Sequence, residues 1–86
     1  MPVRIDLVYE GSLRTRARHG PSGTELSTDA PKDNEGRGES FSPTDLLATA
    51  LGSCMLTLMG IAAQRRGVTL EGARASVEKH MAADPQ

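Results

Sequence analysis

Residues 42–67, S-P-T-D-L-L-A-T-A-L-G-S-C-M-L-T-L-M-G-I-A-A-Q-R-R-G, are the stretch that decides the fold of this chain. They begin as a helix does: Ser42 is a good N-cap, and Pro43 suits the first helical position because its missing N–H would be unpaired there anyway. At the other end, Arg65 lies where the helix dipole favours a cation, and Gly67 can adopt the left-handed conformation that ends a helix. The stretch therefore predicts one long helix.

The interior of this predicted helix, between Asp45 and Arg65, contains no charged residue. Leucine, methionine and isoleucine side chains fall on nearly every side of it, so we expect a long central helix that is buried all round. Cys54 lies near its middle and is the one cysteine of the chain. The question of function is therefore largely what this thiol does.

Length and composition indicate one small domain, residues 1–86, with a modest core. Only Tyr9 and Phe41 are aromatic, so the core must come from the helix and from aliphatic strand faces. The net charge of −1 gives no bulk attraction to nucleic acid or to an anionic membrane, and neither is expected as a partner. A lone cysteine and an N-terminus without a long apolar run predict a cytoplasmic protein without a signal peptide.

The uncharged interior of the helix is also long enough to cross a bilayer. Against that alternative stand three hydroxyl residues, Thr49, Ser53 and Thr57, and two glycines within the run. The flanking segments have the pattern of ordinary soluble strands. We therefore interpret the helix as the core helix of a soluble protein.

The segments around the helix have strand and loop patterns. Residues 3–10 and 13–19 alternate between apolar and polar, and residues 24–28 form a third short run, which together predict an antiparallel β-meander. Residues 32–40 are polar, charged and rich in glycine, as in an exposed loop. Residues 68–81 alternate again and predict a fourth strand. The expected fold class is α+β.

Four motifs resemble the OsmC/Ohr family, named for osmotic induction and organic hydroperoxide resistance, and its OsmC-like subgroup in particular. They are G-S-L-R at 11–14, H-G-P-S-G at 19–23, T-D-A-P at 28–31 and F-S-P-T-D-L-L-A-T-A-L-G-S-C-M at 41–55. The resemblance covers essentially the whole chain. It implies an α+β fold in which two chains intertwine into a homodimer around central cysteine helices, and a thiol peroxidase that reduces organic hydroperoxides.

The chain departs from the family pattern in two places. Family members continue with further strands and a helix that holds a second, resolving cysteine, so the resemblance implies that residues 1–86 correspond to the N-terminal portion of the family fold, whether the chain is naturally short or a fragment. Without that cysteine, the resemblance implies dependence on an external dithiol reductant. The usual family glutamate ahead of the reactive cysteine also has no match, since Thr44 and Asp45 occupy that neighbourhood.

Cys54 is the first candidate catalytic residue, and it must ionise to act. The thiolate is the nucleophile that attacks a peroxide, whereas an apolar pocket raises the pKa of a thiol. A position in the middle of a helix adds no N-terminal dipole, so a cation has to come from elsewhere. The alternative is an inert core cysteine that behaves as a small hydrophobe.

The cation candidates are Arg14, Arg16 and Arg18, which share one face of a predicted strand. Arg14, in the G-S-L-R motif, best matches the family arginine that contacts the thiolate, and a planar guanidinium can also orient peroxide oxygens. Arg16 and Arg18 are the other candidates for contact with the thiolate. Alternatively, all three arginines lie on a solvated strand face and have no role at the cysteine.

Asp45 is the third candidate catalytic residue. Nine residues of a straight helix advance about 900°, so Asp45 points away from Cys54 and lies roughly 13 Å from it along the axis. Either the helix breaks near Leu47, or Asp45 only stabilises the helix start. Thr44 is no closer and lacks a carboxylate.

No cofactor and no metal are expected. His19 and His80 do not form a close ligand pair with the one cysteine, and the G-R-G at 36–38 lacks the sequence context of a phosphate loop. The leading hypothesis is therefore a thiol-dependent peroxidase for small organic hydroperoxides. The alternative is a non-catalytic protein of this fold, either a binder of a small apolar ligand or an inactive truncated remnant.

Overall fold

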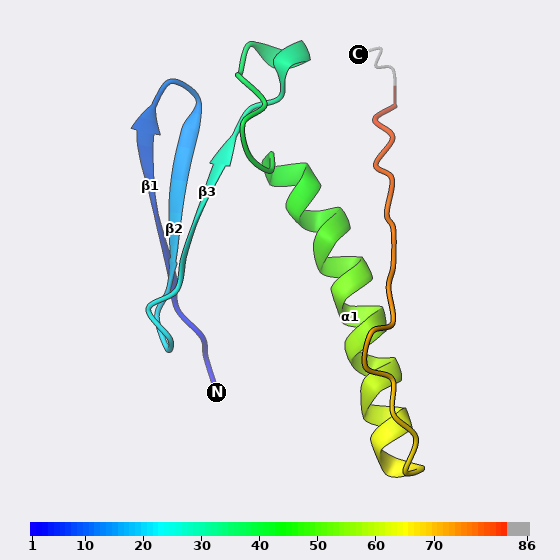
Figure 1. Cartoon of the computed structure of the whole chain (residues 1–86). Helices are drawn as coiled ribbons and strands as arrows, with labels where there is room; N and C mark the ends of the chain where they lie inside the picture. Colours follow the sequence, from blue (N-terminus) through cyan, green and yellow to red (C-terminus); the bar gives the residue numbers. More distant parts are fainter. Residues whose placement is uncertain (83–86) are drawn as a thin grey trace. The chain divides into compact units, whose positions relative to one another are not determined.

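The computed structural model describes residues 1–82 of the chain. The chain divides into two compact units, Met1–Pro43 and Thr44–Gln86. The first unit contains three strands and a short 3₁₀ helix, and the second contains nearly all of one long helix and the segment that follows it (Figure 1).

The first unit is an antiparallel sheet with the strand order β1-β2-β3. Its strands are β1 (Ile5–Gly11), β2 (Arg14–His19) and β3 (Glu25–Asp29), each joined to the next by a short turn (Figure 1). Their register aligns Leu7 with Ala17 and Ala17 with Leu26, so apolar side chains share one face of the sheet. The predicted antiparallel meander is confirmed.

The turn between β1 and β2 has an unusual backbone. Gly11, Ser12 and Leu13 all have positive φ angles, of 89°, 55° and 62°, and the register shifts between Tyr9 and Gly11. A left-handed leucine is rare because its side chain is crowded there. This conformation ends the strand pattern, and β2 therefore begins at Arg14 rather than at Leu13 as the alternation predicted.

The loop between β3 and the long helix is folded back on itself. It contains η1 (Lys32–Asn34), and the amide of Gly36 donates to the carbonyl of Pro31 at 2.9 Å. The amide of Gly38 donates to the carbonyl of Ala30 at 3.1 Å. A side chain at Gly36 would bring a Cβ to 1.8 Å from that Ala30 oxygen, so only glycine permits this approach.

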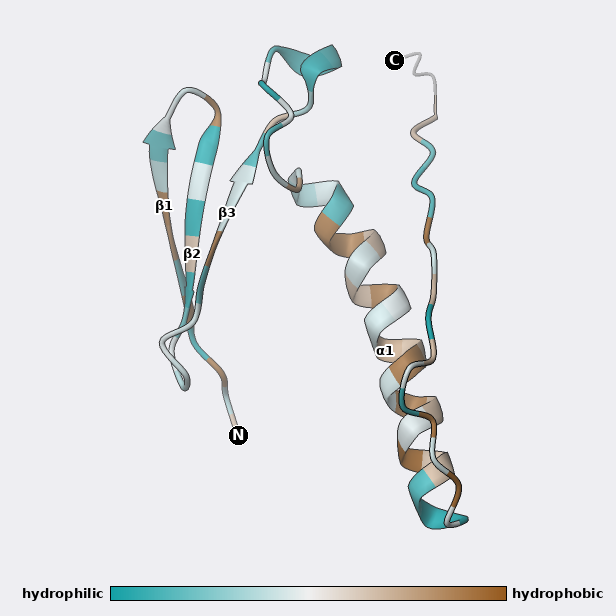
Figure 2. Ribbon diagram, in the orientation of Figure 1, coloured by the Kyte–Doolittle hydropathy of each residue, from teal (hydrophilic) through white to brown (hydrophobic). Residues whose placement is uncertain are grey.

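The long helix is α1 (Pro43–Arg65), with 23 residues, and its start and end agree with the sequence signals. Gly67 has a φ of 69°, and the amide of Val68 donates to the carbonyl of Ala63 at 2.9 Å, which closes the last turn. Hydrophobic and neutral residues alternate along it without a polar face (Figure 2). It is long and apolar enough to cross a membrane by length and composition, a test that core helices of soluble proteins also pass.

The sequence predicted that this helix is buried on all sides, but residues 1–82 leave most of it exposed. Gly52 is the one buried residue of α1, and Leu47 and Leu51 are 71% and 62% exposed. Among residues 1–82 no hydrophobic side chain is buried. Within the described part of its own unit, one extended segment lies beside the helix, and a single segment cannot surround it (Figure 1).

The fourth strand predicted for residues 68–81 is wrong for the described chain, in which these residues form no strand. They run back along α1 (Figure 1). Val77 packs against Gly52 of the helix, and Lys79 reaches Asp45. A strand needs a neighbour with unpaired backbone N–H and C=O groups. The neighbour here is a helix, whose backbone groups are already paired internally.

Gly36→Ala should destabilise the first unit, because the added methyl would overlap the Ala30 carbonyl and force the loop to move. The expected loss is about 1–3 kcal/mol, measured by urea unfolding followed by circular dichroism. Gly60→Ala is the matched control, since nothing lies within 4 Å of its added methyl and alanine favours a helix by about 1 kcal/mol. Equal midpoints for both variants would contradict this packing.

Candidate functional site

Cys54 lies in the second unit, in the middle of α1, as a free and exposed thiol. The apolar pocket expected around it is therefore not formed by this chain alone. A groove of about 350 Å³ beside it is lined by Thr49, Gly52 and Ser53 together with Val77, and Cys54 is not part of its wall. The described chain leaves the sulfur open to solvent and to small molecules.

Asp45 lies at the first turn of α1 and pairs with a residue outside the helix. Lys79 Nζ is 2.8 Å from Asp45 Oδ1 and donates to Thr44 Oγ1 at 3.0 Å. These contacts tie the segment after the helix to the helix start. Because α1 is continuous from Pro43 to Arg65, without a break near Leu47, the helix keeps Asp45 and Cys54 on opposite sides.

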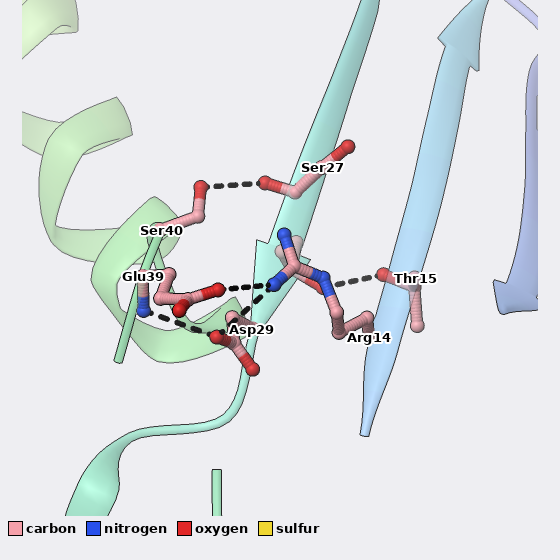
Figure 3. A network of polar contacts seen from close by, with 7 residues as sticks. Arg14, Thr15, Ser27, Asp29, Glu39 and Ser40 are labelled. Carbon is pink, nitrogen blue, oxygen red and sulfur yellow. Dashed lines mark hydrogen bonds and ion pairs between the residues drawn. The ribbon is translucent and has the colours of Figure 1, made fainter. Parts of the chain in front are cut away.

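Arg14 begins β2, in the first unit, and lies directly opposite Asp29 of β3 in the sheet register. Its Nη1 atom is 2.9 Å from Glu39 Oε1 and 3.5 Å from Asp29 Oδ2, so one guanidinium joins two carboxylates (Figure 3). The Arg14 side chain is only 30% exposed. It is a partly buried cation whose Nη1 atom contacts two carboxylates.

Arg16 and Arg18 have different surroundings. Arg16 pairs with Glu10 and, at 3.8 Å, with Glu25, and Arg18 is 3.9 Å from the second oxygen of Glu25. All of these groups are at least partly exposed on the sheet surface, where ion pairs contribute little to stability. Of the three arginines, Arg14 alone contacts a fully buried carboxylate.

Asp29 is that carboxylate, with 0% of its surface exposed. Its Oδ2 accepts a hydrogen bond from the Glu39 amide at 3.0 Å, and its own amide donates to the carbonyl of Phe41 at 3.0 Å. The Glu39 bond, supported by the backbone of Arg37 and the charges of Arg14 and Arg37, lowers the pKa of Asp29 although burial opposes the shift. Its Oδ1 has no hydrogen-bond partner.

Hydroxyl contacts fix the strands around this carboxylate. Thr15 and Thr28 hydrogen bond across β2 and β3 at 2.5 Å, and Ser40 Oγ donates to the carbonyl of Ser27 at 2.8 Å (Figure 3). These bonds hold the residues after Gly38 against β3. The sequence analysis did not single out Asp29 or Glu39, although Asp29 stands in the quoted T-D-A-P motif.

The three predicted site residues thus fall in two units. Arg14 belongs to the first, and Asp45 and Cys54 to the second. The contact between an arginine and the thiol, and the choice among Arg14, Arg16 and Arg18, stay predictions.

Two other features bear on possible binding sites. Among residues 1–82, no three His, Cys, Asp or Glu side chains come together so that they could hold a metal ion. A second groove, of about 500 Å³, lies between the C-terminal half of α1 and residues 68–73, with Leu56, Ile61 and Leu70 in its wall.

Comparison with known families gives the class of this protein. The family model described as OsmC-like protein matches residues 36–86, which include α1 and Cys54. The chain belongs to the OsmC-like protein family. The resemblance found in the motifs is therefore confirmed.

One solved structure is similar over most of the chain. It is a protein from Psychrobacter arcticus 273-4 named for osmotic stress induction and a detoxification response, with 56% sequence identity and a TM-score of 0.90. The match covers 94% of this chain and 59% of that one, so this chain spans little more than half of the relative's length. The match confirms the predicted α+β, OsmC-like fold. A comparison with curated proteins found no match.

Asp29 should make stability fall in acid. Its folded pKa lies below the ordinary value of 3.8, so its contribution is complete above about pH 4 and is lost as the pH falls through the folded value. We expect the urea midpoint to drop as the pH falls below 4 and to drop less in Asp29→Asn. Identical acid dependence in both proteins would contradict an ionised Asp29.

Proposed function

We propose that this protein is an OsmC-like, thiol-dependent peroxidase that reduces small organic hydroperoxides in the cytoplasm as part of a stress defence. The observation that supports it most is the position of Cys54, an exposed thiol in the middle of α1 and within the residues that match the family. The stress-related name of the similar Psychrobacter protein supports the same class of role.

The first half of the reaction oxidises Cys54. The thiolate Sγ attacks one peroxide oxygen, an S–O bond forms as the O–O bond breaks, and the departing alkoxide takes up a proton and leaves as an alcohol. The cysteine becomes a sulfenic acid and the hydroperoxide is reduced. Arg14 assists by favouring the thiolate and by orienting the peroxide oxygens.

The second half restores the thiol. Residues 1–86 hold one cysteine, so the sulfenic acid finds no second thiol among them, and we assign its reduction to an external donor. An external dithiol supplies the two electrons: its first sulfur displaces water and forms a mixed disulfide, and its second sulfur then releases Cys54 as the dithiol closes into a disulfide. Without such a donor, excess peroxide oxidises the sulfenic acid further.

Asp45 has a supporting part in this proposal. Its carboxylate is paired with Lys79 and lies on the opposite side of the helix from Cys54 in the same chain. We assign it to the start of α1 and to anchoring the segment after the helix, rather than to the sulfur chemistry.

The same proposal requires a homodimer. Large apolar side chains on several faces of α1 are exposed in the single chain, and covering each is worth about 1.5–3 kcal/mol. A second copy offers an equally apolar helix, and small residues such as Ala48 and Ala62 permit close approach. Gly52, another small residue of α1, is already covered by Val77 of its own chain.

Cumene hydroperoxide should be consumed faster by this protein than by an equal concentration of a free thiol, and turnover should require added dithiothreitol. Cys54→Ser should lose the reaction completely, because serine is not ionised at neutral pH. Peroxide loss can be followed with a ferrous iron–xylenol orange assay. A wild-type rate no higher than that of the free thiol, or sustained turnover with no thiol donor, would overturn the mechanism.

Light scattering should find a dimer at micromolar concentration. A single chain that leaves the apolar side chains of α1 in water would be poorly folded, since their total cost is comparable to the whole stability of a small domain. The stability should therefore rise with protein concentration. A monomer that unfolds cooperatively at micromolar concentration would contradict the dimer.

The groove between α1 and residues 68–73 favours a second candidate function, the binding of a small apolar ligand without turnover. Its volume of about 500 Å³ is within the range of small-molecule sites, and Leu56, Ile61 and Leu70 give it an apolar wall. An inert Cys54 in the peroxide assay, together with saturable binding of a fluorescent fatty acid, would favour this function over the peroxidase.

A further inference from the structure

We infer that Asp29 is the positioning residue for Arg14, and that it sets the direction in which the Arg14 guanidinium acts. This inference rests on the proposed function, in which Arg14 assists Cys54. It adds to that function a residue that touches neither the thiol nor the peroxide and acts through the arginine.

The first support is the geometry of the pair. Arg14 and Asp29 face each other across β2 and β3, and Arg14 Nη1 lies 3.5 Å from Asp29 Oδ2 (Figure 3). The position of the two backbones is fixed by the sheet and by the hydrogen bond between Thr15 and Thr28 one residue further along. The carboxylate therefore sits at a fixed distance from the start of the arginine side chain.

The second support is that the same oxygen orders the other group on Arg14. Asp29 Oδ2 accepts the amide of Glu39, and the Glu39 carboxylate contacts Arg14 Nη1 at 2.9 Å. Asp29 therefore holds Arg14 directly and also places its second partner. Glu39 is 56% exposed and cannot by itself fix the guanidinium as firmly as a buried group does.

The third support is the incomplete bonding of Asp29. Its Oδ1 is buried without a hydrogen-bond partner, an arrangement that lowers stability. Asparagine would fill the same volume, but it would lose the negative charge that pairs with Arg14. The anion is therefore the form of this residue that holds the cation in place.

The Asp29→Asn substitution should shift the pKa of Cys54 in opposite directions for the two possible roles of Asp29, a positioning residue or simply a nearby negative charge. If Asp29 were only a nearby anion, Asp29→Asn would leave the site more positive and lower the pKa of the Cys54 thiol. If Asp29 positions Arg14, the substitution frees the guanidinium and the pKa of Cys54 rises. We expect a rise of about one unit, and hence about tenfold less thiolate at a pH below both values.

The test measures the rate of Cys54 alkylation by iodoacetamide between pH 5 and 10 in the full chain. Wild type, Arg14→Ala, Asp29→Asn and the double variant are compared, with Asp33→Asn as the matched control at an exposed position of η1. We expect Arg14→Ala to raise the Cys54 pKa by about 1–3 units and the double variant to add nothing further. The control should leave the profile unchanged.

The outcomes are distinguishable. A Cys54 pKa that rises in Arg14→Ala but is unchanged or lower in Asp29→Asn would overturn the positioning role and leave the proposed function standing. A profile unaffected by Arg14→Ala would overturn both the role of Arg14 and this inference. Effects of the two substitutions that simply add would show that Asp29 does not act through Arg14.

A measurement on the wild type covers the case in which Asp29→Asn does not fold. A guanidinium held by Asp29 and Glu39 rotates slowly about its Nε–Cζ bond, so ¹⁵N NMR should resolve separate signals for the two Nη groups of Arg14. The exposed Arg18 should give one averaged signal as an internal reference. An averaged signal for Arg14 would overturn the inference.

Discussion

An apolar helix has to be covered, and this requirement determines the rest of the molecule. α1 has hydrophobic side chains on nearly every side, yet within residues 1–82 only Gly52 of the helix is buried. The segment after the helix covers a narrow strip, through Val77 and Lys79. A chain with this helix gains most of its stability from whatever surrounds the remaining faces.

The same requirement bears on the chemistry. In the proposed peroxidase, the exposed Cys54 is accessible, but a thiol in water gains no specificity for one kind of hydroperoxide. A surface that covers α1 would also form walls around the sulfur, so the proposed dimer would link assembly to substrate choice. The ordered group around Arg14 contrasts with this, because Asp29, Glu39 and the β2–β3 pairing form it within one unit of one chain.

The sequence predicted the elements whose signals are local. Pro43 and Gly67 marked the ends of α1 correctly, and alternation found all three strands. The predicted strand at 68–81 failed because alternation describes side chains, whereas a strand also requires a partner backbone. Leu13 was predicted to belong to β2 because the alternation of apolar and polar residues does not reveal its left-handed backbone conformation.

The site was predictable only in part. Cys54 stood out as a lone thiol in an uncharged helix, and the motif around Arg14 distinguished it from its neighbours. The carboxylates that hold Arg14 were missed because they lie 15 and 25 residues away. Their meeting depends on the register of β2 with β3 and on the tight passage of Gly36 past Ala30, which no local pattern encodes.

The open edge of the sheet has a practical consequence for handling the protein. Among residues 1–82, β1 pairs with β2 on one side only, and its Leu7, Val8 and Tyr9 side chains are exposed. A strand edge of this kind is a template for further strands, and neither proline nor lysine interrupts it between Ile5 and Gly11. Precipitation from concentrated solutions would then proceed by strand addition at β1, and a lysine placed on this edge offers a route to a more soluble protein.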